Sequence, residues 1–115
     1  MLMKPPLPLE RAIQAAVVDH WRILGQPDTI VGAIPNAGAL GMAGLTKGLA
    51  DLVVLGPRVK AGFIELKRGP HSPVSDEQRD FRALCEKLRI PYALAIGRDQ
   101  PIRVLEDWGV VRGAA

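Results

Sequence analysis

The sequence predicts an α/β domain with elements in the order αβββαβ and a weaker helix at the end. Apolar residues recur at helical spacing over residues 9–24. Two apolar strands, 51–55 and 61–67, then flank a Gly-Pro-Arg turn. A second helix begins near Ser75 and precedes an apolar run at 92–96. These alternating patterns favour strands packed against helices.

The first helix is expected over residues 9–24, after a proline-rich lead-in. Its apolar positions are Leu9, Ile13, Ala16, Val17, Trp21 and Leu24. Glycine, proline and aspartate follow and end the helix, and residues 29–34, rich in branched side chains, predict a short strand. Residues 36–48 contain four glycines without the arrangement of a phosphate-binding P-loop, and we interpret them as an active-site or substrate loop.

The next two strands carry charges that an apolar hairpin has little reason to hold. If the hairpin is centred near Arg58, Asp51 and Glu65 lie equally far from the turn and face each other. Side chains alternate along a strand, so Lys67 shares the face of Glu65, while Ile64 and Leu66 point the other way. The sequence therefore predicts two neighbouring carboxylates with a lysine beside them.

Glycine, serine and prolines at 69–73 interrupt the chain before the second helix, which is expected from Ser75 to about residue 88. Ser75 and Gln78 form a capping-box pattern. We expect this helix to bury Phe81, Leu84, Cys85 and Leu88. Residues 92–96 predict a strand buried on both faces, and residues 102–108 a short final helix.

Length and composition predict one compact domain over residues 1–115, with a modest core from 48% hydrophobic residues. The single cysteine, Cys85, cannot form an internal disulfide, which favours a reducing, cytoplasmic location. No apolar stretch reaches the length of a membrane span, so a soluble protein without a membrane partner is expected. The net charge of +3 favours an anionic partner but does not identify nucleic acid.

Two carboxylates on adjacent strands offer the hard oxygen ligands that Mg²⁺ or Mn²⁺ prefers, and these ions also accept phosphate oxygens. Lys67 on the same face can stabilise negative charge that develops on a phosphate. The alternative is a solvent-facing strand on which Glu65 and Lys67 are ordinary polar positions, and a lone Glu-x-Lys pattern favours that interpretation. The opposed Asp51, the glycine-rich loop and the glutamine of the following helix favour the metal site.

Taken in order, several segments resemble the PD-(D/E)XK nucleases, and specifically their virus-type replication-repair branch, VRR-NUC. The segments are Glu10, Asn36 in Pro-Asn-Ala-Gly, Lys-Gly-Leu-Ala-Asp-Leu at 47–52, Glu-Leu-Lys at 65–67 and Ser-Asp-Glu-Gln at 75–78. The resemblance covers most of the chain and implies a restriction-endonuclease-like αβββαβ core, with a mixed sheet flanked by helices. Ala50 stands where the superfamily name has proline.

The resemblance also implies roles for individual residues. Asp51, Glu65, the backbone carbonyl of Leu66 and Glu10 would hold Mg²⁺ or Mn²⁺. Lys67 would assist hydrolysis, supported by Gln78.

For each of the other candidate site residues, the sequence also allows a purely structural explanation. Glu10 would also suit the positive end of its helix dipole, and Gln78 is explained equally well as a cap. Asn36 fits a turn as well as a contact to DNA. Lys47 and Arg68 are candidate phosphate contacts next to the core motif, although surface cations are common.

We therefore expect a metal-dependent endodeoxyribonuclease that acts as a homodimer on branched DNA such as a four-way junction. A flap or general endonuclease is the nearest alternative. A module that holds branched DNA without cutting it is a second, and metal-dependent cleavage separates it from the nuclease. A scaffold protein with no affinity for nucleic acid is a third, and DNA binding at low salt would exclude it.

Overall fold

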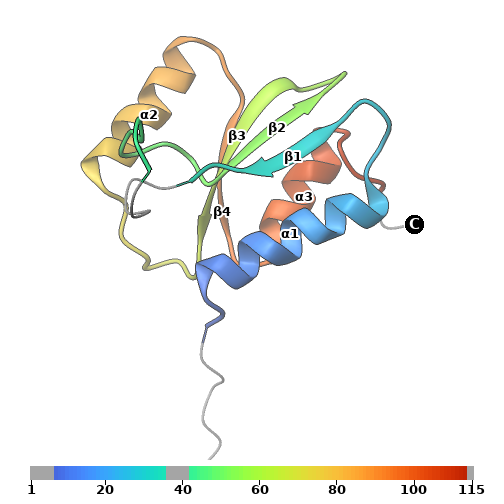
Figure 1. Cartoon of the computed structure of the whole chain (residues 1–115), viewed down its shortest axis with the longest axis horizontal. Coiled ribbons are helices and arrows are strands. Elements are labelled where there is room, and N and C mark those ends of the chain that lie inside the picture. The colour runs from blue at the N-terminus through green and yellow to red at the C-terminus, as the bar shows by residue number, and fades with distance from the viewer. Residues whose placement is uncertain (1–6, 36–41, 114–115) are drawn as a thin grey trace, which may run out of the picture.

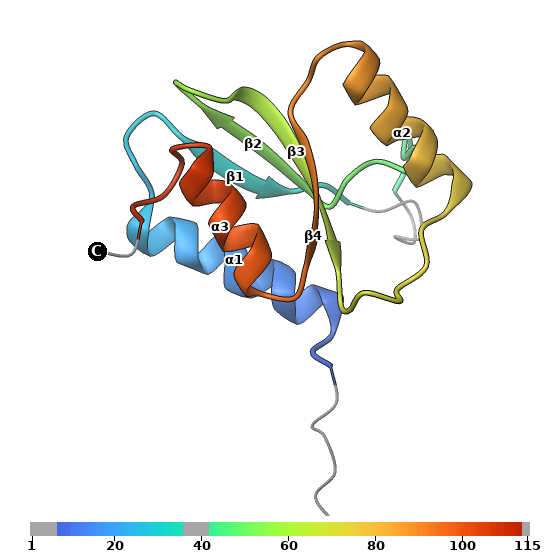
Figure 2. The same cartoon turned by 180° about the vertical axis from the view of Figure 1, so that it is seen from behind.

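The computed structural model describes residues 7–35 and 42–113, which form a four-stranded mixed sheet with helices on both faces (Figures 1 and 2). The elements are α1 (Glu10–Leu24), β1 (Ile30–Ala33), β2 (Leu52–Gly56), β3 (Lys60–Lys67), α2 (Asp76–Lys87), β4 (Tyr92–Ile96) and α3 (Asp99–Asp107). The strand order is β1-β2-β3-β4, antiparallel except for the parallel pair of β3 and β4. This arrangement confirms the predicted α/β class and the αβββαβ core.

The hydrophobic core lies between the sheet and the helices α1 and α3, which pack side by side on one face (Figure 1). In β2 and β3 the even-numbered residues point to this core, because side chains alternate along a strand, and their partners Val31 of β1 and Ala95 of β4 join them. The fully buried members include Leu52 and Val54 of β2, Ile64 and Leu66 of β3, and Leu105 of α3. The odd-numbered residues of β2 and β3 point to the opposite face, where Phe63 and Glu65 contact α2.

The β2–β3 hairpin has the predicted register. Leu52 pairs with Ile64 and Gly56 with Lys60, so the centre of the turn lies at Arg58. Lys60 has a φ of 66°, the left-handed conformation that closes the turn. Extending the ladder by one residue beyond Leu52 and Ile64 brings Asp51 opposite Glu65.

The burial predicted for α2 is wrong at two positions. Cys85 is buried, but Leu84 and Leu88 are 51% and 57% exposed, and Phe81 is half-buried. The reason is that α2 stands at one end of the sheet and packs on β4 (Figure 2). Phe81 does reach the sheet, where its ring contacts Phe63 edge-on at a centroid distance of 5.1 Å.

Two further expectations need correction. β4 is an edge strand with only Ala95 fully buried, so this apolar run is not buried on both faces. α3 begins at Asp99, three residues before the expected start, because Pro101 occupies the first turn, where a missing N–H costs nothing. None of the helices over residues 7–35 and 42–113 is both long enough and apolar enough to cross a membrane.

A matched pair of leucine substitutions tests which side of the molecule holds the core. Leu52→Ala should lower the free energy of unfolding by about 2–5 kcal/mol, because Leu52 is fully buried. Leu84→Ala should change it by no more than about 0.5 kcal/mol, since that side chain is half in solvent. Urea denaturation followed by circular dichroism measures both, and equal losses would contradict the exposed position of α2.

Candidate active site

Asp51 lies at the junction of three strands, immediately before β2. Its backbone carbonyl accepts a hydrogen bond from the Ile34 N–H at 2.8 Å, which continues the pairing of β1 with β2. Its side-chain Oδ2 accepts the Leu66 N–H of β3 at 2.7 Å. Main-chain contacts on both sides therefore hold the Asp51 carboxylate against β3, next to Glu65.

Glu65 is a buried carboxylate, only 2% exposed, with one oxygen engaged and one unpaired. Its Oε1 accepts a hydrogen bond from Gln78 Nε2 at 2.9 Å, while Oε2 has no hydrogen-bond partner among the described residues. Burial, followed by repulsion from Asp51, raises the pKa of Glu65 to about 8. A buried oxygen without a donor, beside a second carboxylate, is an environment that a cation would stabilise.

Lys67 lies on the same face of β3 as Glu65, as predicted, and is 5% exposed. Its Nζ donates hydrogen bonds to the Pro73 carbonyl at 2.8 Å and to Gln78 Oε1 at 3.1 Å. Its third neighbour is Glu65 Oε1, at 3.7 Å. These contacts fix the position of the ammonium group, so the Lys67 side chain has lost most of its conformational freedom.

Gln78 makes the hydrogen bonds of both predicted alternatives, the helix cap and the contact with Lys67. It completes the capping box of α2, because its N–H donates to Ser75 Oγ and its Oε1 accepts the Ser75 N–H. The same amide also bridges Lys67 and Glu65. The cap of α2 and the charged pair of β3 are therefore one hydrogen-bonded unit.

An open cleft of about 470 Å³ lies beside the two carboxylates. Asp51, Glu65 and Gln78 line it, together with Glu10 and Lys47. The segment before β2 approaches α2 so closely that a Cβ on Gly48 would overlap the Glu77 carbonyl oxygen. Gly48 also has a φ of 89°, so glycine is the residue that allows this wall of the cleft.

Glu10 is exposed in the first turn of α1, and its charge adds to the repulsion that raises the pKa of Glu65. Over residues 7–35 and 42–113, no three His, Cys, Asp or Glu side chains form a ready metal-binding group. The structure thus brings Asp51 and Glu65 together and leaves Glu10 within electrostatic reach in the wall of the same cleft. The pair still fits a hard divalent cation, because Glu65 Oε2 is buried and receives no hydrogen bond from any residue that the structure describes.

The remaining predicted site residues lie as follows. The Leu66 side chain is in the core on the opposite face, so only its backbone can serve the site. Lys47 is exposed in the lining of the cleft. Asn36 falls outside the described residues.

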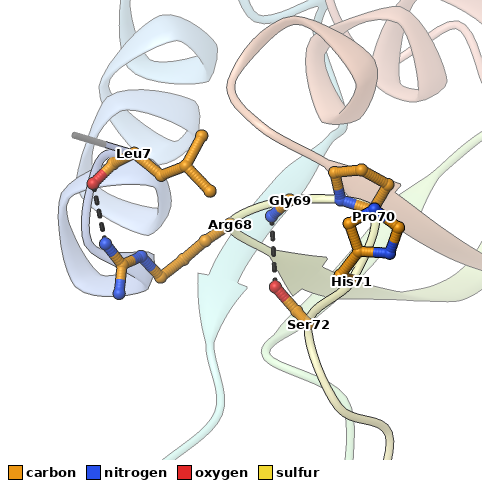
Figure 3. Close-up of a pocket in the computed structure, with 6 residues that line it drawn as sticks. All are labelled: Leu7, Arg68, Gly69, Pro70, His71 and Ser72. Carbon is orange, nitrogen blue, oxygen red and sulfur yellow. Dashed lines mark hydrogen bonds between the residues drawn. The ribbon is translucent and has the colours of Figure 1, made fainter. Parts of the chain in front are cut away.

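Arg68 donates hydrogen bonds to the carbonyls of Leu7 and Pro8, and lines a separate hollow with Gly69 and His71 (Figure 3).

Two groups at the site, the Pro73 carbonyl and Glu77, were not predicted from the sequence. The Pro73 carbonyl holds Lys67, but a main-chain acceptor leaves no mark on residue type. Glu77 lines the cleft, and its place in the capping segment concealed that role.

Two solved structures share the fold. One, described as a VRR_NUC domain protein, aligns with a TM-score of 0.73 at 19% identity, covering 92% of this chain and 90% of the other. Another, described as a VRR_NUC domain, aligns with a TM-score of 0.62 at 18% identity, over 84% of this chain and 94% of the other. No family sequence model and no curated protein matches the chain. At these identities the likeness shows the fold alone.

The raised pKa of Glu65 predicts that the metal-free protein loses stability as pH rises. The ordinary pKa of 4.5 applies to the unfolded chain and about 8 to the folded one, so between these values only the folded state binds the proton. The contribution of this proton to the free energy of unfolding is complete below pH 4.5 and is lost as pH rises through 8. The free energy of unfolding should fall by up to about 1.4 kcal/mol per pH unit within this window.

Urea denaturation in EDTA, at intervals from pH 5 to pH 8.5, measures this dependence. Glu65→Gln is the matched control, because it keeps the shape and removes the titration; its profile should be flatter. Identical slopes in both proteins would show that another group carries the effect.

Proposed function

We propose that the chain is a Mg²⁺- or Mn²⁺-dependent endonuclease that hydrolyses phosphodiester bonds in DNA. The observation that carries this proposal is the buried Glu65 beside the half-buried Asp51, with one Glu65 oxygen that lacks a hydrogen-bond partner among the described residues and an ordered lysine on the same face. The nuclease-type fold supports it. A polar outer face of a strand would instead leave Glu65 and Lys67 in solvent, and both are buried.

Asp51 and Glu65 would hold the ion, with the backbone carbonyl of Leu66 and the Glu10 carboxylate as further ligands. When bound, the ion would polarise the phosphate and lower the pKa of water. Burial, followed by repulsion from Asp51, raises the pKa of Glu65, so ionising both carboxylates is unfavourable without a cation and would become favourable with one. Binding would displace the proton that Glu65 otherwise retains.

Lys67 would stabilise the negative charge that develops on the phosphorus oxygens during hydrolysis. Its Nζ donates two hydrogen bonds, to Pro73 and Gln78, and an ammonium group has three protons. The third proton lies nearest to Glu65 Oε1, 3.7 Å from Nζ and beyond hydrogen-bond distance, and is the one that would turn to the substrate. Because Gln78 already orients the lysine, little reorganisation is needed when charge develops, which is where such a donor is most effective. Gln78 is thus proposed as a support of Lys67 and Glu65.

We further propose that the enzyme acts as a homodimer on branched DNA. A two-fold pair would present two active sites, one for each strand of a symmetric junction. Exposed apolar side chains on the sheet support such an association: Ile30 and Leu55, partners across β1 and β2, are 51% and 44% exposed. Lys47, in the cleft lining, is a candidate phosphate contact, as is Asn36.

A cleavage assay on labelled linear, flap, splayed and four-way-junction DNA tests the function. We expect cutting with Mg²⁺ or Mn²⁺, none with EDTA, and none by Glu65→Ala purified in parallel. The junction should be the preferred substrate. Cutting that persists in Glu65→Ala would point to a contaminating nuclease, and tight junction binding without cutting would favour the non-cleaving binding module.

A second test concerns Lys67. Lys67→Met keeps the apolar stem and removes the ammonium, and should lower kcat at least about 100-fold while DNA binding is largely retained. Lys60→Met removes the same charge from the exposed hairpin turn and should cut normally. Gel-shift binding and single-turnover cleavage separate the two effects. Loss of binding equal to the loss of cleavage would argue against a role in the chemical step.

A further inference from the structure

The start of α1 is held by a distant part of the chain and has no local cap. The N-cap residue is Leu9, whose side chain makes no capping hydrogen bond. Helix starts without such a cap are less stable by about 1 kcal/mol. Glu10, the proposed metal ligand, is the first residue of this helix, so fraying would move it away from Asp51 and Glu65.

Arg68 supplies a tertiary anchor at this point. Its Nε donates to the Pro8 carbonyl at 2.9 Å and one terminal nitrogen donates to the Leu7 carbonyl at 2.8 Å (Figure 3 shows the second contact). A planar guanidinium group can bind two adjacent carbonyls in this way, whereas a lysine offers a single point of attachment. The contacts span 60 and 61 residues of sequence and fix the two residues that precede the N-cap.

Gly69 adds a second contact to the same segment. The Leu7 side chain lies so close to it that a Cβ on Gly69 would be 2.8 Å from Leu7 Cδ1. The turn that follows is closed by the Gly69 N–H, which donates to Ser72 Oγ, and by the Ser72 N–H, which donates to the Gly69 carbonyl (Figure 3 shows the first). Arg68 and Gly69 together thus hold the lead-in to α1.

We propose that Arg68 is a positioning residue that anchors Leu7 and Pro8 and so holds Glu10 in the wall of the carboxylate cleft. This inference rests on the proposed metal site. Lys67 and Arg68 are successive residues at the end of β3: Lys67 bonds to Gln78 on the α2 side, and Arg68 bonds to the segment before α1. The end of β3 therefore contacts both the α2 side and the α1 side of the site.

The test is a double-mutant cycle read by metal binding in the absence of DNA. Mn²⁺ titration by calorimetry should show about 10-fold weaker binding in Arg68→Ala and a similar loss in Glu10→Gln, because a supporting residue acts through its ligand. The double variant should lose little more than either single one. Arg68→Lys should recover only part of the affinity, and Arg103→Ala, which removes an exposed charge from α3, should bind as wild type.

A second measurement follows the anchor itself. Hydrogen exchange at the Ala12 and Ile13 amides, which both donate to the Leu9 carbonyl, should accelerate in Arg68→Ala and not in Arg103→Ala. Additive losses in the cycle, or faster exchange with unchanged Mn²⁺ affinity, would overturn the proposal. So would a loss of DNA binding alone, because Arg68 would then be a phosphate contact.

The two proposals fail in different ways. If wild-type protein takes up no Mn²⁺ and Asp51→Ala behaves identically, the metal site itself is refuted, and the role of Arg68 with it. If wild type binds Mn²⁺, Asp51→Ala does not, and Arg68→Ala binds as wild type, only the inference about Arg68 is wrong.

Discussion

The burial of Glu65 is the constraint on which the rest of the site depends. A carboxylate at 2% exposure is costly to ionise unless partners compensate it, and Asp51 beside it adds repulsion. Lys67 and Gln78 engage one of its oxygens and leave the other unpaired. The protein therefore maintains an electrostatically unfavourable arrangement that a bound cation would relieve, and it keeps the lysine ordered at the same time.

The fold can sustain this arrangement because the two faces of β3 have separate tasks. Ile64 and Leu66 belong to the core against α1 and α3, which stabilises the strand whatever lies on its other side. Glu65 and Lys67 face α2, which packs on the edge strand β4 and leaves room for a cleft. The exposed leucines of α2 follow from the same geometry, since a helix fully packed on the sheet would close the site.

Contacts between remote segments then assemble the groups. The Gln78 amide ties the first turn of α2 to β3, Gly48 lets the segment before β2 approach α2, and Arg68 ties the end of β3 to the start of α1. Each contact joins a backbone or side-chain group to a partner far away in sequence. The stability of the site therefore depends on these tertiary contacts, and the intrinsic stability of the separate helices would not be enough to maintain it.

The order of the elements, the hairpin register and the face that Glu65 and Lys67 share could all be predicted from the sequence, because side-chain alternation and turn position are local properties. The exposure of Leu84 and Leu88 depends on how the helix packs, since amphipathic spacing does not say how much of a helix contacts the sheet. Only the tertiary structure decided that Gln78 serves both cap and site, and that Arg68 binds the α1 lead-in. These depend on distances between segments that are far apart in the chain, and no local pattern encodes them.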